Sequence, residues 1–259
     1  MKYPIINNQL FKLNRENFKK RLSNGSIAIF QSNDEFPRSG DQSFTLKQNP
    51  DLFYLSGIDQ EQSILILFPD CPNKQYKEVL FLRQTSEHIA VWEGHKLTIQ
   101  EAKKVSGIEN IYWLDEFWNI LPSIINYADI IFLNTNENDR YAHQVPYRDI
   151  RFIEKLKNFY PLHRYERAAP ILRDLRPVKS AIEVELTQKA CDITRDAFNR
   201  ILKVIKPGIA EYEIEAELSH EFLRNRSKGF AYTPIIASGK NACVLHYIEN
   251  NQQCEDGDV

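Results

Sequence analysis

The sequence lacks the features that mark membrane and secreted proteins. Its longest run of apolar residues, Ile64 to Phe68, is far shorter than the roughly 20 residues that cross a bilayer. The N-terminal residues 1–9 contain neither an apolar signal core nor a small-residue cleavage site. We therefore expect a cytoplasmic protein with no membrane partner.

Neither sign of charge dominates, and cysteine is scarce. The 33 Lys and Arg residues are matched by 35 Asp and Glu residues, for a formal net charge of -2, so we expect no nucleic-acid partner. The 4 cysteines show no C-x-x-C spacing, which argues against a zinc knuckle or a thioredoxin motif and favours free thiols. With 42% hydrophobic residues and only 9 glycines, the composition is typical of a globular chain.

The motifs of the common hydrolases are also missing. His220-Glu221 lacks the second histidine of H-E-x-x-H, and the chain has no glycine-rich phosphate loop and no G-x-S-x-G serine. The 6 histidines have no second His or Cys at ligand spacing. Residue patterns alone therefore predict no metal ligand in this chain.

The first part of the chain alternates helix and strand signals. Apolar runs bounded by turn residues predict strands, and amphipathic runs with caps predict helices. The expected strands are 26–31, 63–68, 78–82 and 129–133, and the expected helices are 14–22, 98–105 and 147–159. This alternation predicts an α/β domain over residues 1–172.

The pattern changes near Arg173 to Pro177, and we expect a second domain over residues 173–259. Ser180 and Glu183 form a capping box that opens a long helix, which Pro207-Gly208 stops. Residues 211–218 alternate with a strand-like period of two. We still predict a helix there, because the run extends to Arg224 and is rich in helix formers.

The last segments read as strands and turns. Residues 233–238 and 243–247 are expected to be strands around a Gly-Lys-Asn turn, and residues 256–259 form a turn that leads into a further strand. His246 stands out among the histidines because it ends the apolar run 243–246 beside polar residues that could orient a titratable ring. The alternative is that His246 caps the strand by bonding to local backbone or to Glu249.

Seven segments in order give the sequence a family resemblance. The series resembles the creatinase-fold metallopeptidases, most closely the aminopeptidase P (Xaa-Pro aminopeptidase) group. The Leu-His-Tyr-x-Glu-Asn form of one segment is closer to this group than to bacterial prolidase. The segments are Asn49–Gly57, Ile89–Gly94, Leu175–Leu186, Lys206–Gly208, Ile236–Gly239, Leu245–Asn250 and Asp256–Val259.

The resemblance implies a fold and a cofactor. The fold would be a creatinase-like α/β N-terminal domain followed by the first part of an α+β pita-bread peptidase domain. The family holds two divalent metals, usually Mn²⁺, on two Asp, one His and two Glu, and the first of these ligands would follow Val259. We therefore expect no metal ligand within this chain, and no peptide hydrolysis by these 259 residues alone.

The resemblance also implies site residues. The histidine that matches His246 acts on substrate and is not a metal ligand. The tryptophan that matches Trp92, in the segment 90–94, reaches into the active site of a neighbouring subunit. We therefore expect His246 to be catalytic and substrate-binding, Trp92 to be exposed and substrate-binding rather than a core tryptophan, and the protein to be a homo-oligomer, either a dimer or a tetramer.

The predicted function is hydrolysis of the N-terminal peptide bond that precedes proline. The expected substrates are peptides with proline at the second position. Three alternatives stay open: a prolidase, a metal-free creatinase-like amidinohydrolase that uses His246 as a proton shuttle, and a non-catalytic peptide- or histone-binding module of the same fold.

Overall fold

The structure, a computed structural model, describes residues 3–138 and 145–258, so His143 and Val259 lie outside it. The chain divides into two compact units, Ile6–Lys179 and Ser180–Val259 with Met1–Ile5. The division falls at Lys179, seven residues after the expected boundary at 172, because helix α8 (Ala169–Leu175) continues past 172 and packs Leu175 as well as Leu172 against the core of the larger unit. Of the helices in the described ranges, none is both long and apolar enough to cross a bilayer.

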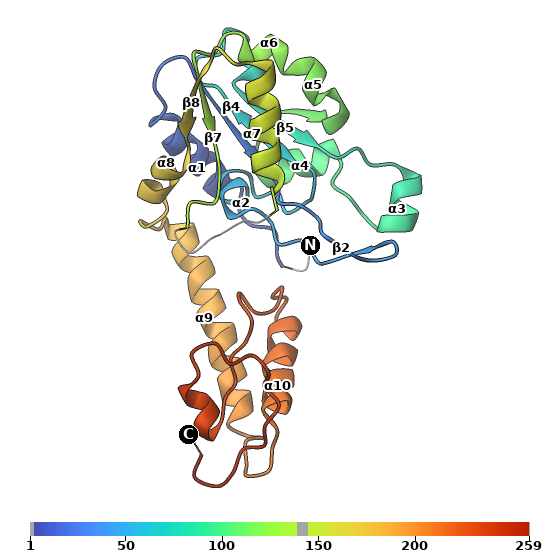
Figure 1. Cartoon of the computed structure of the whole chain (residues 1–259), viewed down its shortest axis with the longest axis vertical. Helices are drawn as coiled ribbons and strands as arrows, with labels where there is room; N and C mark the ends of the chain where they lie inside the picture. Colours follow the sequence, from blue (N-terminus) through green and yellow to red (C-terminus); the bar gives the residue numbers. More distant parts are fainter. Residues whose placement is uncertain (1–2, 139–144, 259) are drawn as a thin grey trace. The chain divides into compact units, whose positions relative to one another are not determined.

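The larger unit is built on a six-stranded mixed sheet with the order β6-β5-β4-β1-β7-β8. Figure 1 shows β4, β5, β7 and β8 of this sheet. The central strand β1 (Ser26–Gln31) pairs antiparallel with β4 and parallel with β7. The remaining strands are β4 (Ile64–Leu67), β5 (Glu78–Leu82), β6 (Asn110–Trp113), β7 (Ile130–Leu133) and β8 (Arg164–Arg167), and a separate hairpin consists of β2 (Pro37–Ser39) and β3 (Gln42–Ser43).

Helices cover both faces of this sheet. Alternate residues of β1 point to opposite faces, so Ile27 and Ile29 join one core cluster while Ala28 and Phe30 join the other. The first cluster is closed by α5 (Phe117–Ile120), α6 (Pro122–Ile125) and α7 (Arg148–Phe159). The second is closed by α1 (Gln9–Lys19), α2 (Pro50–Ser56), α4 (Ile99–Ser106) and α8.

The expected strands and caps of this unit are largely confirmed. Strands β1 and β5 have the predicted bounds, and every residue of β1 is buried. Helix α4, predicted over 98–105, begins at a capping box of Thr98 with Glu101 and ends at Gly107, which adopts a left-handed conformation. The first helix runs from Gln9 to Lys19 rather than over 14–22.

The smaller unit contains two long helices and then a coiled segment, residues 225–258. Helix α9 (Ala181–Ile201) starts at the predicted cap Ser180, and α10 (Glu211–Arg224) confirms the predicted helix over the alternating run. Its core cluster has three buried apolar residues, Ile201, Ile209 and Ile214. A core this small leaves polar contacts to fix the segment that follows α10.

The predicted strands at 233–238 and 243–247 are wrong in this structure. Residues 233–238 are irregular, and residues 239–243 form a 3₁₀ turn, η3 (Gly239–Cys243). An extended segment becomes a strand only when a neighbour pairs with its backbone. In the described part of this unit, β-type backbone pairing is limited to one isolated bridge, between Ala210 and Gln253. The turn predicted near the end of the chain is present, at Asp256-Gly257.

Candidate active site

A buried glutamate anchors the coiled segment of the smaller unit. Glu211 is the first residue of α10, and its side chain has no exposed surface. One carboxylate oxygen accepts hydrogen bonds from the Ser238 backbone N–H at 2.7 Å and its hydroxyl at 2.8 Å. The other accepts from the Tyr247 hydroxyl at 2.6 Å and the Gln252 N–H at 3.0 Å. A single side chain therefore holds three separate points of the segment.

The hydrogen bonds decide the charge state of this carboxyl group. Burial raises the pKa of Glu211, but the donors on Tyr247, Gln252 and Ser238 together lower it below the ordinary value of 4.5. The opposite holds for Tyr247, because burial and its bond to Glu211 raise the pKa of the phenol. Glu211 is thus a carboxylate at neutral pH, and Tyr247 is the protonated donor.

A second polar residue ties the same segment to α10. The Asn250 amide donates to Glu215 at 2.8 Å and to the Pro234 carbonyl at 3.2 Å, and it accepts from the Ile236 N–H at 3.0 Å. Asn250 has a φ of 46°, in the left-handed region that asparagine tolerates better than most residues. Residues 234–252 are therefore held by side chains rather than by a β-ladder.

His246 lies in this anchored segment but not at the end of a strand. It occupies an exposed turn directly before Tyr247, which is only 7% exposed. Across the described residues its imidazole has no hydrogen-bond partner, and Glu249 instead accepts the Ile248 N–H at 3.2 Å. The ring is thus free to meet another molecule, and the bond to Glu249 that we considered as an alternative is not formed.

A cavity of about 290 Å³ lies next to the Glu211 network. Its lining includes Glu211, Ser238, Cys254, Asp256 and Asp258, and it does not include His246. Over the described ranges, no group of three or more His, Cys, Asp or Glu side chains is placed to hold a metal ion. The described residues therefore do not fit a metal centre, and we assign no chemical step to a metal ion bound by them.

Trp92 belongs to the larger unit. It lies on the short helix α3 (Glu87–Glu93) and is 76% exposed, as expected. No residue of α3 is buried. The helix is held by its Ser86 cap and by two bonds of 2.6 Å from the Arg83 guanidinium to Glu93. A forked ion pair thus fixes the helix that presents the exposed indole.

Replacing Glu93 with Gln should loosen this helix. The change weakens the fork to Arg83, and exposed pairs of this kind contribute about 0.2–1 kcal/mol. We expect amide exchange at Ala90, which donates to the Ser86 carbonyl, to accelerate roughly two- to fivefold in NMR measurements. Glu87→Gln, on the same helix and outside the ion pair, should change exchange less. Equal effects of the two variants would show that the fork does not hold the helix.

The sequence did not reveal the anchoring role of Glu211. Glu211 is the first residue of the alternating run 211–218 and follows Pro207-Gly208, and these features indicated only the start of a helix. The partners lie 27, 36 and 41 residues further along the chain, so only the folded segment brings them together.

Comparison with known proteins gives two family matches in order. Residues 11–132 match the aminopeptidase P N-terminal domain, and residues 185–259 match metallopeptidase family M24. Xaa-Pro aminopeptidase of Escherichia coli K12 is 28% identical over 98% of this chain. Among solved structures, Pseudomonas aeruginosa aminopeptidase PepP has a TM-score of 0.83 at 27% identity, covering 98% of this chain and 57% of that one.

A further solved structure, a Zn-substituted E. coli aminopeptidase P in complex with product, has a TM-score of 0.83 at 25% identity and covers 98% of this chain and 58% of that one. The chain spans 58% of the length of the E. coli curated relative. The M24 match implies a divalent metal cofactor for the family. The fold therefore combines an aminopeptidase P N-terminal domain with part of an M24 catalytic domain.

Proposed function

We propose that this chain, as a member of the aminopeptidase P group of pita-bread metallopeptidases, serves an enzyme that removes the N-terminal residue preceding proline. The observation that carries the proposal is the order of the two matched domains, at 11–132 and 185–259, together with structural similarity over 98% of the chain. Proline at the second position suits a dedicated enzyme. The bond before it is a tertiary amide with no N–H for a general peptidase to hold.

The proposal extends to the metal. A pair of Mn²⁺ ions in the whole protein would supply an activated water and polarise the carbonyl group. One E. coli structure is Zn-substituted, so activity should be measured with Zn²⁺ as well as with Mn²⁺. Because the described residues do not fit a metal centre, the family's ligands would have to come from outside them.

His246 and Trp92 are the residues of this chain that we assign to substrate. A neutral imidazole can donate one hydrogen bond and accept another, so His246 would hold the peptide and stabilise charge in the tetrahedral intermediate. The exposed indole of Trp92 would contact substrate bound by a neighbouring subunit of a homo-oligomer, dimer or tetramer. We place the enzyme in the cytoplasm, with peptides rather than nucleic acid or membrane as its partners.

A pair of matched tripeptides tests the function. The polypeptide that carries this sequence is isolated from the cells that make it and incubated with Mn²⁺ and either Ala-Pro-Ala or Ala-Ala-Ala. We expect release of the first alanine from Ala-Pro-Ala, little from Ala-Ala-Ala, and none after chelation, measured by mass spectrometry. Residues 1–259 produced alone should release no alanine.

Other outcomes identify the alternatives. Cleavage of the dipeptide Ala-Pro in preference to Ala-Pro-Ala would mean a prolidase. Hydrolysis of creatine without added metal would mean an amidinohydrolase. Binding of Ala-Pro-Ala without cleavage by the isolated protein, with metal supplied, would mean a non-catalytic module. Each of these results overturns the proposal.

A further inference from the structure

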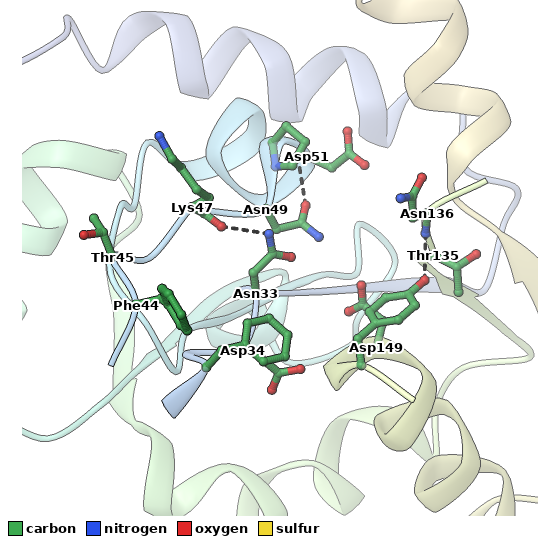
Figure 2. Close-up of a pocket in the computed structure, with 13 residues that line it drawn as sticks. Asn33, Asp34, Phe44, Thr45, Lys47, Asn49, Asp51, Thr135, Asn136 and Asp149 are labelled. Atoms are coloured by element: carbon green, nitrogen blue, oxygen red, sulfur yellow. Dashed lines mark hydrogen bonds between the residues drawn. The ribbon is translucent and has the colours of Figure 1, made fainter. Parts of the chain in front are cut away.

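The larger unit contains a cavity of about 500 Å³ that the proposed peptidase reaction does not use. It lies beyond the carboxyl ends of the parallel strands β1 and β7 and is lined by residues that follow them, among them Asp34 and Asn136. The first residues of α2 and α7, the residues that flank the β2–β3 hairpin and Lys47 also contribute to the lining (Figure 2). This edge of a parallel sheet is where α/β folds commonly bind ligands, and the volume is within the range of about 300–1,000 Å³ for small-molecule pockets.

Two of the three aspartates that line the cavity are already paired. Asp34 accepts the Arg148 N–H at 2.8 Å and bonds the Arg151 guanidinium at 2.6 Å. Asp51 bonds the Arg176 guanidinium at 2.6 Å. The protein itself therefore neutralises these two carboxylates.

The third aspartate, Asp149, has no such partner. It lines the cavity and is 6% exposed, yet in the described part of the chain its carboxyl group forms no hydrogen bond and no ion pair. Burial raises the pKa of Asp149 to about 7. Arg148 on its own helix opposes this rise, while Asp34 and Asp51 add to it. The carboxyl group faces the cavity with no donor from the described residues, so the site favours a ligand that brings one.

Two phenylalanine side chains also line the cavity. Phe36 and Phe44 flank the β2–β3 hairpin, where the Phe44 N–H donates to the Phe36 carbonyl at 2.8 Å. Both rings are more than half exposed. Figure 2 shows Phe44, Asp34 and Asp149 around the same hollow. Aromatic faces attract organic cations and also pack against apolar groups.

We propose that this cavity binds a small free amine in its ammonium form. The ammonium N–H donates to the carboxylate of Asp149, and the carbon skeleton lies against Phe36 and Phe44. A metal ion fits less well, because no three acidic, His or Cys side chains in the described ranges converge on one point. Lys47 also lines the cavity, but an anion would meet the unpaired carboxylate of Asp149, and the Arg148 N–H at the start of α7 is already bound by Asp34.

Three molecules of similar shape and different charge test the proposal. Benzylammonium, benzyl alcohol and benzoate are titrated into the full chain at pH 8, and ¹H–¹⁵N spectra report the shifts around residues 33–51 and 134–149. We expect saturable binding of benzylammonium, at least about tenfold weaker binding of benzyl alcohol, and none of benzoate. Preference for benzoate, equal binding of all three, or no binding would overturn the proposal.

Variants locate the contact. Asp149→Asn should weaken benzylammonium binding at least about tenfold, and Phe44→Ala roughly two- to fivefold. Asp115→Asn, at an exposed position outside the cavity, should leave it unchanged. If Asp149→Asn does not fold, a measurement on the unmodified chain still tests the proposal. Saturating benzylammonium should favour the ionised carboxylate at least about tenfold, seen by ¹³C NMR as a lower pKa of Asp149. An unchanged pKa would contradict the assignment.

Discussion

Replacing Glu211 with Ala should unfold the segment that follows α10. The change leaves the Ser238 N–H and hydroxyl, the Tyr247 hydroxyl and the Gln252 N–H without the acceptor that they share. Each buried donor left unpaired costs about 1–3 kcal/mol, so the total loss should be about 3 kcal/mol or more. The small unit has only three buried apolar residues in its core cluster to offset this loss.

Hydrogen exchange followed by mass spectrometry measures this effect. Peptides from residues 234–254 should lose most of their protection in Glu211→Ala. Tryptophan fluorescence should stay unchanged, because Trp92, Trp113 and Trp118 all lie in the larger unit. Glu185→Ala, at an exposed position of α9, is the matched control and should keep native protection. Native protection in Glu211→Ala as well would show that the carboxylate does not organise the segment.

Replacing His246 with Ala should lower kcat of the whole enzyme roughly 10²-fold or more on Ala-Pro-Ala. The exposed imidazole is free of protein partners in the described residues and is carried on a turn that the buried Tyr247 holds in place. Its loss removes a group that would hold the peptide and stabilise the developing charge. Since we do not assign His246 as a metal ligand, bound metal should be unaffected.

His220→Ala provides the comparison for this variant. His220 is exposed on α10 and lies outside the anchored segment. We expect its kcat and metal content to match those of the unmodified protein. A near-normal kcat in His246→Ala, or loss of bound metal measured by mass spectrometry of the metal, would mean that the role assigned to His246 is wrong.

Sequence patterns predicted the buried strands and the helix caps well, because both depend on nearby residues. The apolar runs at 26–31 and 78–82 became β1 and β5, and the Ser180 cap opened α9 as expected. Strand β8 gave no signal. It is an edge strand of the sequence Arg-Tyr-Glu-Arg, and its place depends on pairing with β7 rather than on its own apolar residues.

The candidate sites were harder to foresee because their chemistry arises from distant segments. His246 stood out through its place at the end of an apolar run as well as through the family resemblance, and Trp92 through the resemblance. The structure shows both exposed. Asp149 looked like an ordinary acidic residue in the first turn of a helix. Its carboxyl group becomes an unpaired group in a cavity only because the fold brings the segments after β1 and β7 to the start of α7.

An unselected peptide mixture tests whether this chain serves an aminopeptidase specific for a bond before proline. The protein isolated from its own cells, with Mn²⁺ supplied, is incubated with a tryptic digest of a whole proteome. Mass spectrometry then identifies every peptide that has lost its first residue. We predict that the shortened peptides are those with proline in the second position. Shortening without regard to the second residue, or no shortening at all, would contradict the proposed function.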